Sequence, residues 1–260
     1  MRRFLNRMGD GHARLALFTN PLTLGPFIYL NSLLGMSGYA DGAAVNLWPD
    51  QSGNGHDGTQ SVAAQKPQMN RVNPSFLSPN GSATVHFRGT DANPDNVGGT
   101  LTPNPSVANG YDLLFYGRFW FPVNAAGGSV LFQDDTGGRP QFGFCSSSPN
   151  NKWFKRDDLG TTEGSAFTAT CFCIIRAKFV ASNATQGTFT MSHNDGAGFV
   201  TVLSCPYQFN PAAAGGWILG SNQVFNVPAK MDACAFAWYT KVLTNNQVTG
   251  IYNYWRNQFE

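Results

Sequence analysis

Short apolar or alternating runs recur along most of this sequence, and each is bounded by Gly, Pro, Asn or Asp. A spacing of roughly 8–12 residues between such runs is typical of a β-sandwich. The composition agrees, since aromatic residues make up 13%, charged residues only 12%, and there are 29 Gly and 15 Pro. We therefore expect one all-β domain, an antiparallel two-sheet sandwich of the jelly-roll type.

Two pairs of runs are predicted to form β-hairpins. Residues 129–145 turn around the sequence DDTGG, and residues 187–203 turn around NDG. Gly allows positive φ in such turns, and Asn or Asp can hydrogen-bond to the backbone there. Further strands are predicted at 27–30, 44–49, 83–88, 111–121, 168–180, 216–220 and 231–239.

A short helix is predicted at the C-terminal end, where Thr244 and Gln247 form a T-x-x-Q capping box. Apolar side chains follow at i, i+3, i+4 and i+7, the spacing of one helix face. The strand before it is apolar on both faces, as expected for a strand between a partner sheet and a covering helix. The helix face consists of Val248, Ile251, Tyr252 and Trp255.

The charge distribution is nearly balanced, with 17 basic and 15 acidic residues and a net charge of +2. This disfavours nucleic-acid binding, which needs a cluster of phosphate contacts. We interpret residues 1–26 as a basic docking arm on a domain formed by residues 27–260, and an edge strand plus loop of that domain is the alternative. No clean apolar run precedes a small-residue cleavage site, so neither a signal peptide nor a membrane span is predicted. The basic residues of the arm are Arg2, Arg3, Arg7 and Arg14.

The five cysteines are odd in number and include no CxxC pair, which favours reduced thiols over a disulfide framework. Cys171 and Cys173 alternate with Ile175, Ala177 and Phe179. We expect that face to lie in the core. No His or carboxylate is spaced to complete a metal site with the two thiols.

Three segments carry motifs in the order of a known family. Residues 47–59 read LWPDQSGNGHDGT, residues 80–89 read NGSATVHFRG, and residues 216–244 run from GWILG to the start of the helix. They resemble the W-x-D-x-S-G-N-G-x-D-x-T segment, the N-G-x-x-A-V-x-F-x-G strand and the closing segment of laminin-G-like domains of the concanavalin A-like lectin/glucanase superfamily. The resemblance implies the concanavalin A-like sandwich. Ala233 departs from the pattern, because the family often has Glu there.

Catalysis of the kind found in that superfamily needs paired carboxylates, typically glutamates, on one strand face. This chain has two glutamates, Glu163 in a polar stretch and Glu260 at the end of the sequence. Its four histidines form no HExxH motif. We therefore predict no enzymatic activity.

The resemblance also implies a calcium site, formed by Asp50, Asp57 and Asp232 of the matched segments, since calcium prefers oxygen ligands. Capping of a tight turn is the simpler explanation for Asp50 and Asp57, because the glycines between them let the chain reverse. No other cofactor is predicted.

Sugar binding is frequent in the superfamily and uses aromatic rings and amides in rim loops. Trp153, Phe154 and Tyr207 lie close to polar loops in the sequence, and Asn150 and Asn151 can both donate and accept hydrogen bonds. Packing of these rings onto the core is the alternative.

Two functional classes fit these features. One is a structural or adhesive subunit of a virion, such as a phage capsid-decoration or tail protein, assembled in the host cytoplasm. It predicts a homo-oligomer, for which we expect a trimer, with the arm contacting other virion subunits and with binding to surface glycans. The alternative is a secreted, extracellular carbohydrate-binding module of a bacterium, which predicts a monomer.

Overall fold

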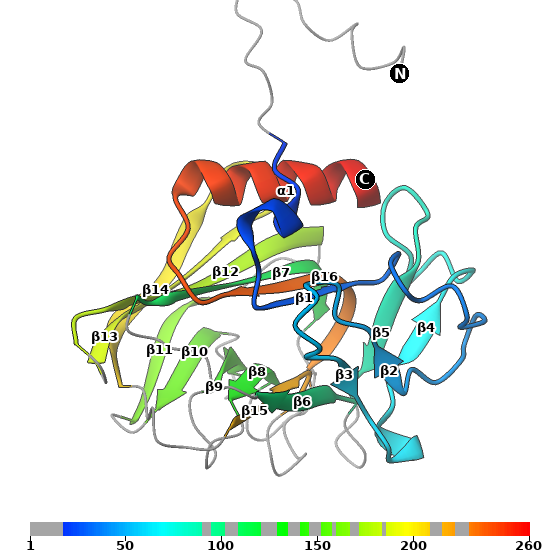
Figure 1. Cartoon of the computed structure of the whole chain (residues 1–260). Coiled ribbons are helices and arrows are strands. Elements are labelled where there is room, and N and C mark those ends of the chain that lie inside the picture. Colours follow the sequence, from blue (N-terminus) through cyan, green and yellow to red (C-terminus); the bar gives the residue numbers. More distant parts are fainter. Residues whose placement is uncertain are drawn as a thin grey trace, which may run out of the picture.

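The fold is a sandwich of two antiparallel sheets with one helix across the outer side of the first sheet (Figure 1). Every strand pairing among the described residues is antiparallel. The predicted all-β sandwich with a C-terminal helix is therefore confirmed. The structure, a computed structural model, describes residues 18–89, 95–101, 109–120, 129–134, 141–145, 152–157, 160–166, 172–183, 186–208, 215–221 and 229–260.

Sheet A has β7 and β16 at its centre. Its strands follow the order β14-β13-β12-β7-β16-β5-β4, and β1 also pairs with β16. The predicted hairpin at residues 187–203 is formed by β13 and β14. The strands are β1 (Ile28–Asn31), β4 (Gln68–Asn70), β5 (Thr84–Arg88), β7 (Tyr111–Trp120), β12 (Phe172–Ala181), β13 (Gln186–Asn194), β14 (Val200–Gln208) and β16 (Lys230–Tyr239).

Sheet B is the second layer, and its order is β11-β10-β9-β8-β15-β6-β3-β2. The other predicted hairpin, at residues 129–145, is formed by β8 and β9. The strands are β2 (Leu47–Trp48), β3 (Gly58–Thr59), β6 (Val97–Leu101), β8 (Ser129–Asp134), β9 (Gln141–Cys145), β10 (Lys152–Asp157), β11 (Gly160–Ala166) and β15 (Gly215–Leu219).

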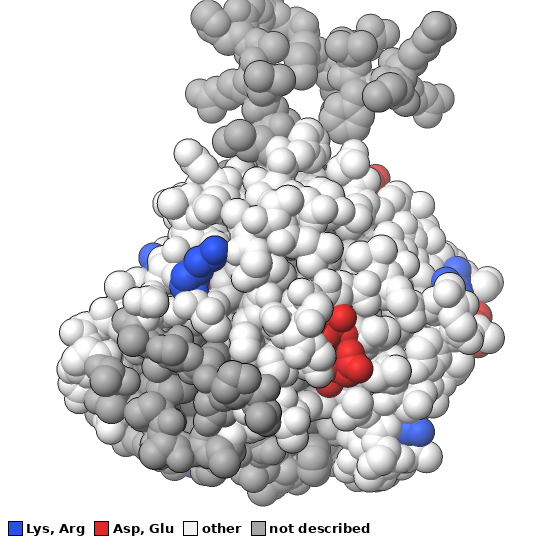
Figure 2. All heavy atoms as spheres, in the orientation of Figure 1, with Lys and Arg blue, Asp and Glu red and all other residues white. Residues whose placement is uncertain are grey.

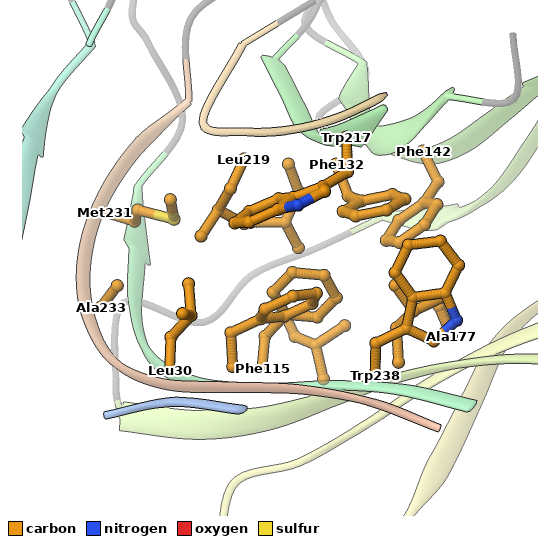
Figure 3. Packing of buried hydrophobic residues seen from close by; sticks show 14 of the residues in the cluster. Leu30, Phe115, Phe132, Phe142, Ala177, Trp217, Leu219, Met231, Ala233 and Trp238 are labelled. Atoms are coloured by element: carbon orange, nitrogen blue, oxygen red, sulfur yellow. The ribbon is translucent and has the colours of Figure 1, made fainter. Parts of the chain in front are cut away.

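The core between the sheets is rich in aromatic rings. Figure 3 shows Phe132 and Trp217 of sheet B pointing toward Phe115 and Trp238 of sheet A. The Phe132 and Trp238 ring centroids are 5.5 Å apart and meet edge to face, a favoured geometry for aromatic pairs. Cys173 lies in this core, as its alternation predicted.

The C-terminal helix α1 (Asn245–Phe259) covers the outer face of sheet A. Thr244 caps it through the predicted box, with Gln247 N–H donating to the Thr244 hydroxyl at 3.2 Å. The predicted stripe is buried against apolar residues of β7 and β16. At the start of the helix, Asp112 of β7 accepts from the Leu243 N–H at 2.7 Å and pairs with Arg176, which fixes the helix to the sheet.

Residues 18–26 lie against the helix layer of their own chain. Thr19 N–H donates to the Gly250 carbonyl at 3.0 Å, and Tyr239 donates to the carbonyl of Pro21 in the short 3₁₀ helix η2 (Pro21–Leu24). A Cβ at Gly250 would collide with the Thr19 side chain, so glycine is needed at this crossing. The four arginines of the predicted arm, Arg2, Arg3, Arg7 and Arg14, lie outside the described residues.

The surface carries few charges. Figure 2 shows Lys, Arg, Asp and Glu scattered singly or in small groups over the face it draws. Among the described residues, no helix has the length and apolar character needed to cross a membrane.

Candidate functional site

The aromatic residues predicted to bind sugar lie in strands, not in rim loops. Trp153 of β10 is 0% exposed and stacks on His193, and Tyr207 of β14 is 1% exposed and stacks on Phe189. Phe154 is 5% exposed. This corrects the prediction of loop platforms, because alternation along β10 and β14 turns Trp153 and Tyr207 into the sandwich. Asn150 and Asn151 lie outside the described residues.

Asp50 and Asp57 hold the turn that the glycines permit. Asp50 Oδ1 accepts from the backbone N–H groups of Tyr29 and Ser52, each at 2.9 Å, and Asp50 Oδ2 accepts from the His56 N–H at 3.0 Å. Asp57 in turn accepts from the Asp50 N–H at 2.7 Å. The carboxylates therefore act as turn caps, which was the simpler explanation.

Asp232 lies elsewhere, on β16, where one carboxylate oxygen contacts a histidine and the other contacts an arginine. Oδ1 is 2.7 Å from His86 Nδ1, and Oδ2 is 2.7 Å from an Arg118 nitrogen. In the part of the chain that the structure describes, no three His, Cys, Asp or Glu side chains are placed to hold a metal ion together. The structure thus does not gather Asp50, Asp57 and Asp232 as calcium ligands.

Asp232 belongs instead to a polar and aromatic surface on the outer face of sheet A, which we call the Trp120 patch. Strand pairing assembles it, because Asp232 lies opposite both His86 of β5 and Arg118 of β7, and Lys230 lies opposite Trp120. Alternation along each strand turns these side chains away from the core. The patch consists of Phe76, His86, Arg118, Trp120, Phe172, Lys230 and Asp232.

Arg118 organises the aromatic part of the patch. Its guanidinium carbon lies 4.5 Å from the centroid of the Trp120 ring and 5.2 Å from that of Phe172. Its nitrogens also donate to Asp232 and to the carbonyl of Ser75. Cation–π contacts and charge-assisted hydrogen bonds together hold the Trp120 ring in one orientation.

His86 is held by the buried carboxylate and by two rings. Asp232 is 0% exposed, and an ionised carboxylate can only accept, so the geometry assigns the proton of the short contact to His86 Nδ1. Phe76 stacks on the imidazole, with ring centroids 4.1 Å apart. The Trp120 ring packs against the imidazole edge to face, with ring centroids 6.5 Å apart.

The patch is accessible as well as rigid. Phe76, Arg118, Trp120, Phe172 and Lys230 are all half-buried, whereas the aromatic rings of the core are covered. A half-exposed indole beside a guanidinium and an ammonium can bind a ring with an apolar face and polar edges.

Sequence reasoning missed this patch, although one signal was present. In the run 111–121, where Asp112 and Arg118 are the charged residues, Arg118 and Trp120 share one face. The other members come from segments whose pairing with this run the sequence does not reveal, as in the separation of 146 positions between His86 and Asp232.

The sequence matches no protein-family model and no curated protein. Solved structures do resemble it. The binding domain of botulinum neurotoxin DC in complex with SialylT matches with a TM-score of 0.55 and 12% identity, over 89% of this chain and 51% of that one. An arabinofuranosidase complexed with arabinofuranosyl-alpha-1,2-xylobiose matches with a TM-score of 0.57 and 13% identity, over 82% of this chain and 50% of that one.

Domain 4 of AbnA, a GH43 extracellular arabinanase from Geobacillus stearothermophilus in complex with arabinotriose, matches with a TM-score of 0.51 and 13% identity. The match covers 78% of this chain and 91% of that domain. The chain spans about half the length of the first solved structures it matches. At these identities the likeness shows the β-sandwich fold alone.

Proposed function

We propose that this chain is a glycan-binding sandwich domain that binds through the Trp120 patch and works without catalysis as an adhesive subunit of a larger assembly. The observation that carries the proposal is the half-exposed Trp120 ring, fixed by Arg118 and flanked by Lys230 and His86. Aromatic rings with polar neighbours on a rigid sheet are suited to sugars, which have apolar faces and hydroxyl edges.

The two glutamates support a role without catalysis. Glu163 is on β11 of sheet B, with Lys152 Nζ 3.3 Å away. Glu260 follows α1 on the outer side of sheet A, where it accepts from the Tyr116 hydroxyl at 2.7 Å. The paired-carboxylate arrangement of a glycosidase therefore has no counterpart in these two residues.

The fold supports the proposal in a general way. The solved structures with this fold include domains and enzymes whose names record bound oligosaccharides, such as arabinotriose in domain 4 of AbnA. We also propose that the chain is a laminin-G-like member of the concanavalin A-like superfamily, on the strength of the three motifs. In this chain the first of them forms the turn capped by Asp50 and Asp57.

The larger assembly that we propose is a virion, with the chain as a phage capsid-decoration or tail protein in an oligomer, for which a trimer is our expectation. Cys205 and Cys234 support assembly in a reducing cytoplasm, because they are buried thiols that form no disulfide. A secreted carbohydrate-binding module is the alternative. Native mass spectrometry separates the two, since a stoichiometric oligomer supports the first and a monomer the second.

Glycan binding is tested on an array with the purified protein and the variant Trp120→Ala. We expect the variant to lose about tenfold or more in affinity for any glycan bound, as truncation of a central Trp does at other interfaces. Phe18→Ala is the matched control, because Phe18 is an aromatic residue that is 52% exposed outside the patch. Both variants should melt within a few degrees of the unmodified protein.

Two results would count against the proposal. A protein that binds no glycan on the array has another function. Unchanged binding by a folded Trp120→Ala variant would place the glycan away from the Trp120 patch.

A further inference from the structure

We infer that the Trp120 patch selects glycans that carry a negative charge. This inference rests on the proposed function and adds the ligand class to it. It follows from how the charges of the patch and its border are balanced.

The charge of Asp232 is already compensated inside the protein. Arg118 donates to Oδ2 through Nε at 3.2 Å and through a terminal nitrogen at 2.7 Å, while His86 donates to Oδ1 at 2.7 Å. Both carboxylate oxygens are thus occupied, and Asp232 is 0% exposed. A ligand therefore meets no uncompensated negative charge from this residue.

Arg88 borders the patch and is compensated as well. It lies opposite Lys230 in the pairing of β5 with β16, but its Nε donates to Asp95 Oδ2 at 2.9 Å. Asp95 is fully buried, and its hydrogen bonds raise the pKa of the Arg88 guanidinium. The Arg88 guanidinium is therefore engaged by Asp95 and is not a partner for the ligand.

Lys230 is the cation of this surface whose charge is not balanced. It takes part in no ion pair among the described residues, and its Nζ lies 5.5 Å from the centroid of the Trp120 ring. The positive charges of Arg118 and Lys230, set against the single negative charge of Asp232, leave one net positive charge beside the indole. An anionic group on a sugar stacked against Trp120 would reach this ammonium.

The anionic group can be a carboxylate, as in a uronic or sialic acid, or a sulfate ester, since an ammonium is a point charge without a preference in shape. Both share the chemistry that the patch recognises. Neutral glycans would contact the same indole ring without the ion pair. The structure therefore predicts a ratio of affinities, with anionic above neutral glycans of the same backbone.

The experiment measures affinities by calorimetry for matched glycans: a uronic acid oligosaccharide, its neutral methyl ester, and a sulfated form of the neutral chain. For the unmodified protein we expect the charged ligands to bind about tenfold more tightly than the ester, as a charge-assisted hydrogen bond allows. This preference should shrink when NaCl is raised, because salt screens the exposed ion pair.

Lys230→Gln should remove the preference, so that the charged ligands and the neutral ester bind the variant with equal affinity. Lys241→Gln is the control, because Lys241 is exposed at the far end of β16, beyond Tyr239. Lys241→Gln should keep the full ratio between the affinities for charged and neutral ligands. Melting temperatures show whether each variant is folded, and the salt series on the unmodified protein tests the inference without any variant.

The outcomes separate this inference from the proposed function. Equal binding of charged and neutral ligands by the unmodified protein, or an unchanged ratio in folded Lys230→Gln, overturns the charge preference while glycan binding stands. Absence of binding to any matched or array glycan overturns the proposed function and the inference with it.

Discussion

At the scale of single residues, the most consequential group is the carboxylate of Asp232. It is fully buried, yet it lies on the outer face of sheet A, covered by the histidine and arginine that contact it. A buried charge of this kind is tolerated because its partners satisfy both oxygens. The same contacts orient Arg118, which in turn fixes the Trp120 ring.

Asp232→Asn tests this dependence. The change keeps the shape but removes the charge opposite Arg118, so we expect the free energy of unfolding to fall by about 2–4 kcal/mol. Urea denaturation measures it. Asp195→Asn, at an exposed carboxylate in the hairpin turn of β13 and β14, should change stability by less than about 0.5 kcal/mol. An equally small change in both variants would contradict the account of Asp232.

At the scale of elements, β7 and β16 carry most of the organisation. One face of each strand lines the core between the sheets, and the other face supports α1. Four tyrosines of this helix layer, Tyr29, Tyr116, Tyr239 and Tyr252, are buried. Burial raises the pKa of Tyr252 to about 12 and raises the pKa of Tyr116 and Tyr239 as well.

The helix layer should therefore be sensitive to alkali. Above pH 10 the unfolded chain loses tyrosine protons that the folded protein retains, so the free energy of unfolding falls as pH rises from 10 through about 12. We expect absorbance at 295 nm and circular dichroism to change together in a titration. Independent tyrosine ionisation in a protein that stays folded would contradict this.

Tyr252→Phe gives the matched comparison, because the Tyr252 hydroxyl is buried without a hydrogen-bond partner. Removing it should leave stability at pH 7 unchanged or raise it by up to about 1 kcal/mol. It should also move the alkaline transition to higher pH. A loss of more than about 1 kcal/mol at pH 7 would show that the hydroxyl has a stabilising partner.

At the scale of the whole molecule, local patterns predicted the layers well. Turn residues and alternation placed both hairpins, and the Thr244 capping box marked the start of the helix. The Trp120 patch could not be predicted from local patterns, because it depends on which strands become neighbours in the sheet. Asp232 meets Arg118 across 114 positions, and no local pattern reports such a pairing. The prediction for Trp153 failed because it relied on the nearness of a polar loop in the sequence. Alternation along β10 is what decides the position of this ring, and it turns the ring into the core.

Glycan binding at Trp120 can be followed through the indole signals of the protein. The chain has six Trp, and of these Trp120 is half-buried. The other five are fully buried: Trp48, Trp153, Trp217, Trp238 and Trp255. In a ¹H–¹⁵N NMR titration with a glycan that the array identifies as a ligand, we expect the Trp120 indole signal to shift with saturation while the other five stay nearly fixed. A Trp120 signal that does not move while the glycan binds would contradict it.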